Sequence, residues 1–237
     1  MLVDTMHWIL DLVFPIRCLG CGCFDTYLCT HCRPDIPTHI AQECIGCART
    51  VQKGQTCVFC AKEWAVDQLF VATDYKNSLV QKLIKTLKYR FVSDIANYLA
   101  PIIMQSLKKA HQSNGTNIFS DNPLIVPVPL TAHRERWRGF NQAQLLAQRI
   151  ADAHQLSCAS NILTRTAHTS PQAEIENRDQ RLTNVSSAFV CENLTVSGRT
   201  VLLVDDVCTT GATLNACARV LKQKGVAKVI GLVVARG

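Results

Sequence analysis

The stretch "VLLVDDVCTTGATL", Val201–Leu214, indicates the fold of this 237-residue chain more clearly than any other. Its first four apolar residues predict a buried strand that ends at Val204, directly before Asp205 and Asp206. Threonines around a glycine follow, and a helix is expected to begin near Gly211. A turn of this kind can present backbone N–H groups and hydroxyls to a phosphate, and the helix dipole favours the same anion.

Strands and helices alternate outward from this stretch. Apolar runs predict strands in "AVDQLFVATDY", "PLIVPVPL", "NILTRT", "TVLLVDD" and "KVIGLVVAR". Amphipathic spacing predicts helices in "SLVQKLIKTLKYR", residues 95–110, "FNQAQLLAQRIADAHQ" and "GATLNACARVLKQKG". Together they predict an α/β domain over residues 64–237, a parallel, doubly wound sheet with helices on both faces. In such a sheet, ligands bind at the carboxyl ends of the strands.

Two carboxylates directly before a phosphate-binding turn suit a sugar whose hydroxyls lie close to its phosphate. A 5-phosphoribosyl group has that layout, with hydroxyls for Asp205 and Asp206 and a phosphate for the turn. The chain lacks the G-x-x-x-x-G-K-[ST] pattern of nucleoside-triphosphate P-loops, and the stretch lacks the three spaced glycines of dinucleotide-binding folds. The alternative interpretation is a capped helix beside two solvated acids.

Cysteines dominate the N-terminal part of the chain, which holds nine of the 13 between Cys18 and Cys60. Four C-x-x-C pairs predict two tetrahedral zinc sites with closed coordination spheres, and therefore structural rather than catalytic metal. The predicted ligands are Cys18, Cys21, Cys29 and Cys32 for one site, and Cys44, Cys47, Cys57 and Cys60 for the other. Cys23 is a fifth thiol that leaves the first set ambiguous. Iron–sulfur ligation and a disulfide framework are the alternatives.

Residues 1–63 are predicted to form a separate domain, an N-terminal helix followed by tandem zinc ribbons. The first 14 residues have helical apolar spacing that ends at Pro15, which suits a helix packed on the protein or one lying at a membrane surface. Asp4 and Asp11 and the lack of a basic segment argue against a secretory signal. No apolar run approaches the roughly 18 residues of a membrane-spanning helix. We expect a cytoplasmic protein, with a peripheral position at the inner membrane as the alternative.

The net charge of +7 permits an anionic partner, and the distribution of charge along the chain indicates which part would bind it. Residues 1–65 hold five Lys or Arg against six Asp or Glu, so the excess of basic residues lies after residue 65. Basic residues interleaved with aromatic ones suit single-stranded nucleic acid, and the candidates are Lys82, Lys85, Lys88, Arg136 and Trp137. A solvated helix face would equally explain the lysines, and a place in the core would explain Trp137 and Phe140.

Val201–Thr213 resembles the signature with which type I phosphoribosyltransferases bind 5-phosphoribosyl 1-pyrophosphate (PRPP), with Cys208 where an aliphatic residue is usual. The resemblance implies that Asp205 and Asp206 are the catalytic acids and hold the ribose hydroxyls. The PRPP-binding segment then continues through Val207, Cys208, Thr209, Thr210, Gly211, Ala212 and Thr213. The segment "PVPL" resembles the pyrophosphate loop, which implies that Pro127, Val128, Arg134 and Arg138 lie on the pyrophosphate side. Mg²⁺ is expected to accompany PRPP.

The tandem cysteine motifs, "LIKTLKY", "RWRGFNQAQLLA" and the PRPP segment together resemble the ComF family along essentially the whole chain. The segment "QRLTNVSSAF" also fits, through Arg181, Asn184 and Phe189, whereas Gln172 receives no role. The resemblance implies handling of single-stranded DNA on the cytoplasmic side during natural transformation, with other DNA-uptake or competence proteins as partners. It leaves open whether the PRPP pocket only binds its ligand or transfers a phosphoribosyl group to a small-molecule or nucleobase acceptor.

Overall fold

The computed structural model describes residues 15–38, 42–89, 92–166, 188–191 and 194–237. The strands are β1 (Gln42–Glu43), β2 (Thr50–Val51), β3 (Gln68–Asp74), β4 (Leu124–Pro127), β5 (Thr164–Arg165), β6 (Phe189–Val190), β7 (Thr200–Cys208) and β8 (Lys228–Arg236). The helices are α2 (Ser78–Tyr89), α3 (Ala96–Asn114), α4 (Ala132–Arg138), α5 (Gln142–His154) and α7 (Ala212–Gln223). Short 3-10 turns are η1 (Arg33–Asp35), η2 (Gln52–Gly54), η3 (Cys60–Lys62), η4 (Ser93–Ile95) and η5 (Leu194–Val196).

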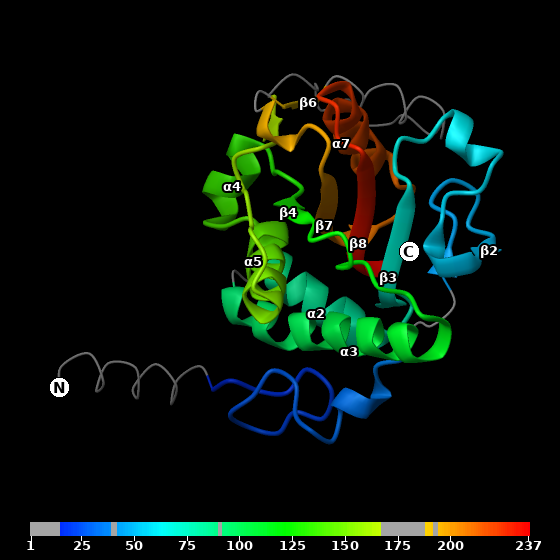
Figure 1. Ribbon diagram of the computed structural model, residues 1–237. Coiled ribbons are helices and arrows are strands. Elements are labelled where there is room, and N and C mark those ends of the chain that lie inside the picture. The colour runs from blue at the N-terminus through cyan, green and yellow to red at the C-terminus, as the bar shows by residue number, and fades with distance from the viewer. Residues whose placement is uncertain (1–14, 39–41, 90–91, 167–187, 192–193) are drawn as a thin grey trace.

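A four-stranded parallel sheet in the order β3-β8-β7-β4 forms the centre of the molecule, as the sequence predicts (Figure 1). Alternate residues of its strands enter two different hydrophobic clusters, because side chains point to opposite faces with a period of two. Helices α2, α3 and α5 cover one face, and α7 covers the other. The predicted fold class is therefore confirmed.

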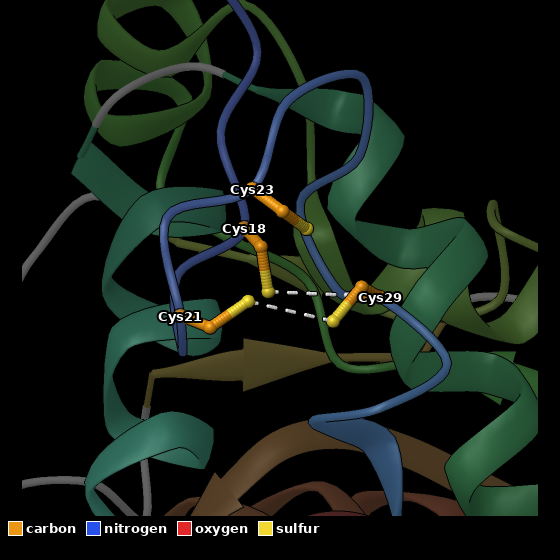
Figure 2. A group of neighbouring side chains, drawn as sticks. All are labelled: Cys18, Cys21, Cys23 and Cys29. Atoms are coloured by element: carbon orange, nitrogen blue, oxygen red, sulfur yellow. Dashed lines mark hydrogen bonds between the residues drawn. The ribbon is translucent and has the colours of Figure 1, made fainter.

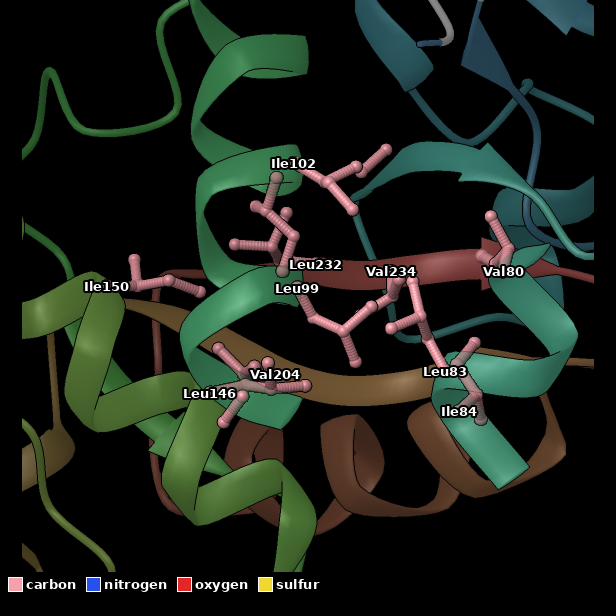
Figure 3. Packing of buried hydrophobic residues seen from close by; sticks show 14 of the residues in the cluster. Val80, Leu83, Ile84, Leu99, Ile102, Leu146, Ile150, Val204, Leu232 and Val234 are labelled. Carbon is pink, nitrogen blue, oxygen red and sulfur yellow. The ribbon is translucent and has the colours of Figure 1, made fainter. Parts of the chain in front are cut away.

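The first face is a close-packed layer of aliphatic side chains (Figure 3). Leu83 of α2, Leu99 of α3 and Leu146 of α5 are fully buried there with Val204 and Leu232 of the sheet. Burying a side chain of this size contributes about 1.5–3 kcal/mol relative to leaving it exposed. This packing fixes α2 relative to the carboxyl end of β7.

The predicted end of the central strand at Val204 is wrong, because β7 continues through both aspartates to Cys208. The neighbouring β8 continues alongside it, and Asp205 pairs with Val233 and Cys208 with Arg236. Helix α4 was not predicted, because "HRERWR" lacks an apolar stripe. Its caps explain it: the Thr131 hydroxyl accepts a hydrogen bond from the N–H of Arg134, and Gly139 adopts the left-handed conformation.

The two cysteine loops, residues 15–38 and 42–63, contact different parts of the α/β domain (Figure 1). In the first loop, the Thr26 hydroxyl bonds to the Tyr98 hydroxyl of α3 at 3.3 Å, and Lys82 of α2 donates to the Leu19 carbonyl at 3.0 Å. In the second, Gln42 of β1 exchanges hydrogen bonds with the backbone of Val71 in β3. The predicted domain boundary between residues 63 and 64 stays a prediction.

Several sequence-based expectations fall outside the described residues: the N-terminal helix over residues 1–14, Gln172, Arg181 and Asn184. Phe189, from the same segment as Arg181, is buried in β6. Within the part of the chain that the structure describes, no helix has the length and apolar character needed to span a membrane.

Candidate functional site

Asp205 and Asp206 lie at the carboxyl end of β7, and their environment is unusual for two acids. The Asp206 side chain is buried, and its Oδ1 forms an ion pair of 2.9 Å with Lys88 Nζ at the end of α2. Its Oδ2 is buried without a hydrogen-bond partner among the described residues. A buried carboxylate oxygen in this state is expected to have a ligand, because an unsatisfied charged acceptor is costly.

Asp205 is half-buried, and its Oδ1 accepts a hydrogen bond of 2.8 Å from the N–H of Asp206. Removal from water, together with the adjacent charge of Asp206, raises the pKa of Asp205 to about 8. Nearby Lys88 acts in the opposite direction. The pair is therefore positioned to receive donors, such as sugar hydroxyls, or positive charge.

The turn after the two acids leads directly into α7. Thr209 is exposed, Thr210 and Thr213 are half-buried, and Gly211 has a φ of 81°. The Thr210 hydroxyl accepts a 3.3 Å hydrogen bond from the N–H of Ala212 at the start of α7. The first N–H groups of a helix have no backbone partner within it, so those that remain unpaired in this turn can donate to an anion. Cys208 is buried in the core, where burial raises its pKa to about 11, so it can contribute only backbone atoms.

The second cysteine loop packs directly against this turn. A Cβ atom added to Gly211 would lie 2.9 Å from Ile45 Cγ1 and 2.9 Å from Trp64 Cζ3. Arg236, at the end of β8, donates to the carbonyls of Cys44 and Ile45 at 3.0 and 2.9 Å. The second loop therefore forms one wall of the turn that the sequence assigns to phosphate.

Lys88, the ion-pair partner of Asp206, lines a cavity of about 410 Å³, which we call the α2–α4 cavity. It is lined by Lys88, Tyr89, Leu130, His133, Arg134, Trp137, Arg138 and Gln142. It thus unites two predicted pyrophosphate-side arginines with two of the nucleic-acid candidates, Lys88 and Trp137. Arg136 is exposed on α4 but is not among the described lining residues.

Arg138 is the buried cation of this cavity. Its Nη1 donates to Gln142 Oε1, and its Nε has no hydrogen-bond partner among the described residues. Burial lowers the pKa of Arg138, and the negative charge of Asp206 opposes that shift. An anionic ligand in the cavity would satisfy this guanidinium.

Pro127 and Val128, which the resemblance assigns to the pyrophosphate side, lie at the end of β4 and directly after it, beside β7. The N–H of Val128 donates to the Val204 carbonyl at 2.9 Å. Asn141 holds the segment from the other side, because its Nδ2 donates to the Val128 carbonyl at 3.0 Å. The Asn141 Oδ1 simultaneously caps α5 by accepting from Ala143 N. This double role explains the asparagine of "RGFNQ".

The remaining nucleic-acid candidates, Lys82 and Lys85, line a second and larger space of about 1170 Å³. We call it the α2–loop groove, since it runs between α2 and the first cysteine loop. Its described lining includes Arg17, Tyr27 and Tyr89. Tyr89 lines both this groove and the α2–α4 cavity.

In the first cysteine loop, the four thiols within 4.8 Å of one another belong to Cys18, Cys21, Cys23 and Cys29 (Figure 2). The Sγ atoms of Cys21 and Cys29 are 3.7 Å apart. Cys32, predicted as the fourth ligand, is outside that set, yet contact with the thiols of Cys21, Cys29 and Cys18 adds to the burial that raises its pKa to about 12. Cys32 thus contacts three of the four thiols of that set, and its choice as a zinc ligand stays a prediction.

In the second loop, Cys44, Cys47, Cys57 and Cys60 form a group within 4.8 Å, the set the sequence predicts. Burial raises the pKa of Cys44, but N–H groups of Cys47, Cys57 and Gly46 outweigh it and lower that pKa to about 6. Cys18 behaves alike, with a pKa of about 6. Because metal ligation requires thiolates, both clusters have the chemistry for Zn²⁺.

Two features of the site were not predicted from the sequence. One is the ion pair of Lys88 with Asp206, which depends on how α2 packs on the sheet. The other is the packing of the second cysteine loop against the turn that follows Asp206. Ile45 and Trp64 lie close to Gly211 of that turn, and Arg236 donates to the Cys44 carbonyl of the loop. The sequence offered one weak signal, an aromatic residue shortly after the last cysteine pair.

Comparisons with known proteins place this geometry in a family. The phosphoribosyl transferase domain family matches residues 91–237. "Competence protein F" of Haemophilus influenzae is 30% identical over 227 residues, which cover 87% of this chain and 95% of that protein. "DNA utilization protein YhgH" of Salmonella typhimurium is 35% identical over 204 residues, covering 85% and 81%. "Competence protein ComFC" of Bacillus subtilis is 27% identical over 215 residues, covering 85% and 80%.

Proposed function

The chain belongs to the ComF family and carries its phosphoribosyl transferase domain, and from this premise we propose a double binding function. The protein binds Mg²⁺ and PRPP at the carboxyl end of β7, and single-stranded DNA beside that site. It acts on the cytoplasmic side in the uptake of DNA during natural transformation, together with other competence proteins. Relatives named for competence and DNA utilization support the biological part.

One observation carries the PRPP part: Asp206 is buried directly before the turn from Thr209 to Thr213, and its Oδ2 has no hydrogen-bond partner in the part of the chain that the structure describes. Ribose hydroxyls donated to Asp205 and Asp206 would satisfy this oxygen, while the turn from Thr209 to Thr213 receives the 5′-phosphate. Arg134 and Arg138 then face the pyrophosphate from the α2–α4 cavity. Mg²⁺ bound together with PRPP would supply positive charge that offsets the negative charge of the pyrophosphate.

Two structural zinc ions complete the protein in this proposal. Each cysteine loop provides at least four thiols in one cluster, and a four-thiolate sphere leaves no position for substrate. Zinc therefore holds each loop in shape, and the second loop in turn forms the wall of the phosphate turn. Metal binding and folding of such small loops are coupled.

Phosphoribosyl transfer to an acceptor is the second candidate function, and the α2–α4 cavity favours it. The cavity lies beside the Lys88–Asp206 ion pair and offers aromatic rings at Tyr89 and Trp137, so a planar acceptor could reach the ribose. In that reaction, the bond from the ribose C1 to pyrophosphate breaks, and the acceptor forms the new bond to C1. Arg134 and Arg138 would stabilise the leaving group.

Isothermal titration of the zinc-loaded protein with Mg·PRPP tests the central binding step. We expect saturable binding by the native chain, and a loss of more than about 1 kcal/mol, or about fivefold in Kd, for Asp206→Asn. This substitution keeps the shape and removes the charge. A thermal melt of the variant verifies folding, and an unchanged Kd in a folded variant would refute the role of Asp206.

A further inference from the structure

We propose that a single nucleic-acid strand runs along one face of α2, from the α2–loop groove into the α2–α4 cavity, and that one base stacks there on Tyr89 and Trp137. This inference rests on the proposed function and gives it a path. It also assigns a role to the first cysteine loop, which forms the opposite wall of the groove from α2.

The α2 face has the geometry of a continuous track. Lys82, Lys85, Thr86 and Tyr89 follow the i, i+3, i+4, i+7 spacing of one helix face, and all four line the groove. Tyr89, the last residue of α2, lines both spaces, so the two share this residue. The proposed strand would follow this face from one space to the other.

The electrostatics of the two spaces favour a polyanion. Arg17, Lys82 and Lys85 line the groove, and Lys88, Arg134 and Arg138 line the cavity. None of the described lining residues of either space is an Asp or Glu. Lys82 donates to the Leu19 carbonyl and holds the loop on α2, which leaves the exposed Lys85 as the groove lysine for phosphate.

Two exposed rings point to bases rather than to an acidic protein. Tyr89 is 60% exposed and Trp137 is 55% exposed, although large aromatic side chains normally lie in the core. Both line the α2–α4 cavity, where the guanidinium carbon of Arg138 lies 5.9 Å from the centroid of the Tyr89 ring. Stacking of bases on rings with Lys and Arg along the backbone is the usual mode of single-strand binding.

Lys88 joins the strand to the PRPP site. It lines the cavity and forms the ion pair with Asp206, so it stands between the two ligands. Ribose hydroxyls on Oδ2 of Asp206 would draw on the charge of the same carboxylate that Lys88 holds through Oδ1, which weakens the ion pair and makes the Lys88 ammonium more available to a phosphate of the strand. The two ligands therefore strengthen each other's binding.

Fluorescence anisotropy of a labelled oligothymidylate, titrated with the zinc-loaded full chain, tests the path. Replacing both rings, Tyr89→Leu with Trp137→Leu, is expected to weaken binding at least about tenfold. The matched control is Phe59→Leu, which removes a ring that is 80% exposed on the second cysteine loop and is expected to change nothing. Tyr89→Phe keeps the ring and should bind as the native chain does.

Charge is tested separately through the salt dependence. Lys85→Gln is expected to reduce the slope of log K against log salt by about 0.7, the value for one phosphate contact on a single strand. The control Lys224→Gln removes the same charge at the end of α7, on the opposite face of the sheet, and should leave the slope unchanged.

The outcomes separate this inference from the function on which it rests. Native binding that the double ring variant and Lys85→Gln leave intact would refute the path, while DNA binding as such would stand. Equal affinity for a duplex of the same length would refute base stacking. No oligonucleotide binding by the native chain would refute both the path and the DNA part of the proposed function, whereas Mg·PRPP titration would still report on the other part. If the double variant misfolds, photo-cross-linking of a thiothymidine oligonucleotide to the native chain tests the path instead. We expect cross-links to Tyr89 or Trp137, and cross-links found only elsewhere would refute the path.

Discussion

The two cysteine loops of this protein share a motif but not a location. "CLGC" begins the first and "CIGC" the second, and Cys18 and Cys44 both have a pKa of about 6. The first loop lies against α2 and α3, beside the α2–loop groove, whereas the second lies against β3 and the turn that contains Gly211. Two loops of equal cysteine spacing thus lie beside two different candidate ligand sites, and the difference comes from residues in and next to the loops together with their partners.

Breaking each loop in turn gives the largest expected effects. Cys44→Ser should release about half of the zinc and abolish measurable PRPP binding, because Ile45 and Trp64 would no longer hold the turn at Gly211. Cys18→Ser should release the same amount but weaken oligonucleotide binding instead. Zinc content by atomic emission, with both titrations on each variant, measures this. Equal loss of both ligands in both variants would erase the distinction between the loops.

Adding one methyl group at Gly211 tests the contact between this turn and the second cysteine loop. Gly211→Ala adds a Cβ at 2.9 Å from both Ile45 and Trp64, in a backbone with φ of 81°. Overpacking and backbone strain together should destabilise the fold by about 2–4 kcal/mol and weaken PRPP binding. The control is Gly139→Ala, which has a φ of 78° but meets nothing within 4 Å. Thermal unfolding of the two variants isolates the contact with the second loop, and equal destabilisation would show that the contact is unimportant.

A smaller effect concerns pH at the phosphate site. Burial raises the pKa of Asp205 to about 8, so the folded chain binds this proton more tightly than the unfolded chain does. Stability of the ligand-free protein should therefore fall as the pH rises from about 4, the ordinary pKa of Asp, to about 8. Because ribose hydroxyls need the ionised acid, PRPP affinity should rise about fivefold between about pH 7 and pH 8. Titrations at both pH values check this, and Asp205→Asn should remove the dependence.

The smallest effect is expected at the fifth thiol. A Cβ on Gly20 would lie 2.7 Å from Cys32 Sγ, just as one on Gly46 would lie 2.8 Å from Cys60 Sγ. From this correspondence we expect Cys32 to be the zinc ligand and Cys23 to be spare, so Cys23→Ser should retain both zinc ions and both affinities. Loss of zinc in Cys23→Ser, with full zinc in Cys32→Ser, would exchange the two roles.

Much of this architecture follows from local sequence pattern. The strand "KVIGLVVAR" has the predicted bounds, because an uninterrupted apolar run between polar residues has little freedom. The two acids and the phosphate turn were predicted together since they are contiguous in the chain. The end of β7 at Cys208 could not be predicted, because pairing with β8 extends the strand past Asp205 and Asp206. In the sequence alone, two adjacent charged residues indicate the end of a strand.

Local sequence patterns could not predict contacts between segments that lie far apart in the chain. Nothing near Lys88 in the sequence indicates its ion pair with Asp206, which exists because α2 packs across the sheet. Equal cysteine spacing likewise predicts equal metal sites but carries no information about where each loop docks. That location is set by single residues such as Ile45, Trp64 and Tyr98, whose partners lie far away in the chain.

The most direct test of the account is oligonucleotide anisotropy with and without Mg·PRPP, in the native chain and in Asp206→Asn. If Lys88 stands between two adjacent ligands, saturating Mg·PRPP should tighten oligonucleotide binding by the native chain about fivefold. The same addition should leave Asp206→Asn unchanged. An identical Kd for the native chain with and without Mg·PRPP would contradict the claim that the two sites act as one.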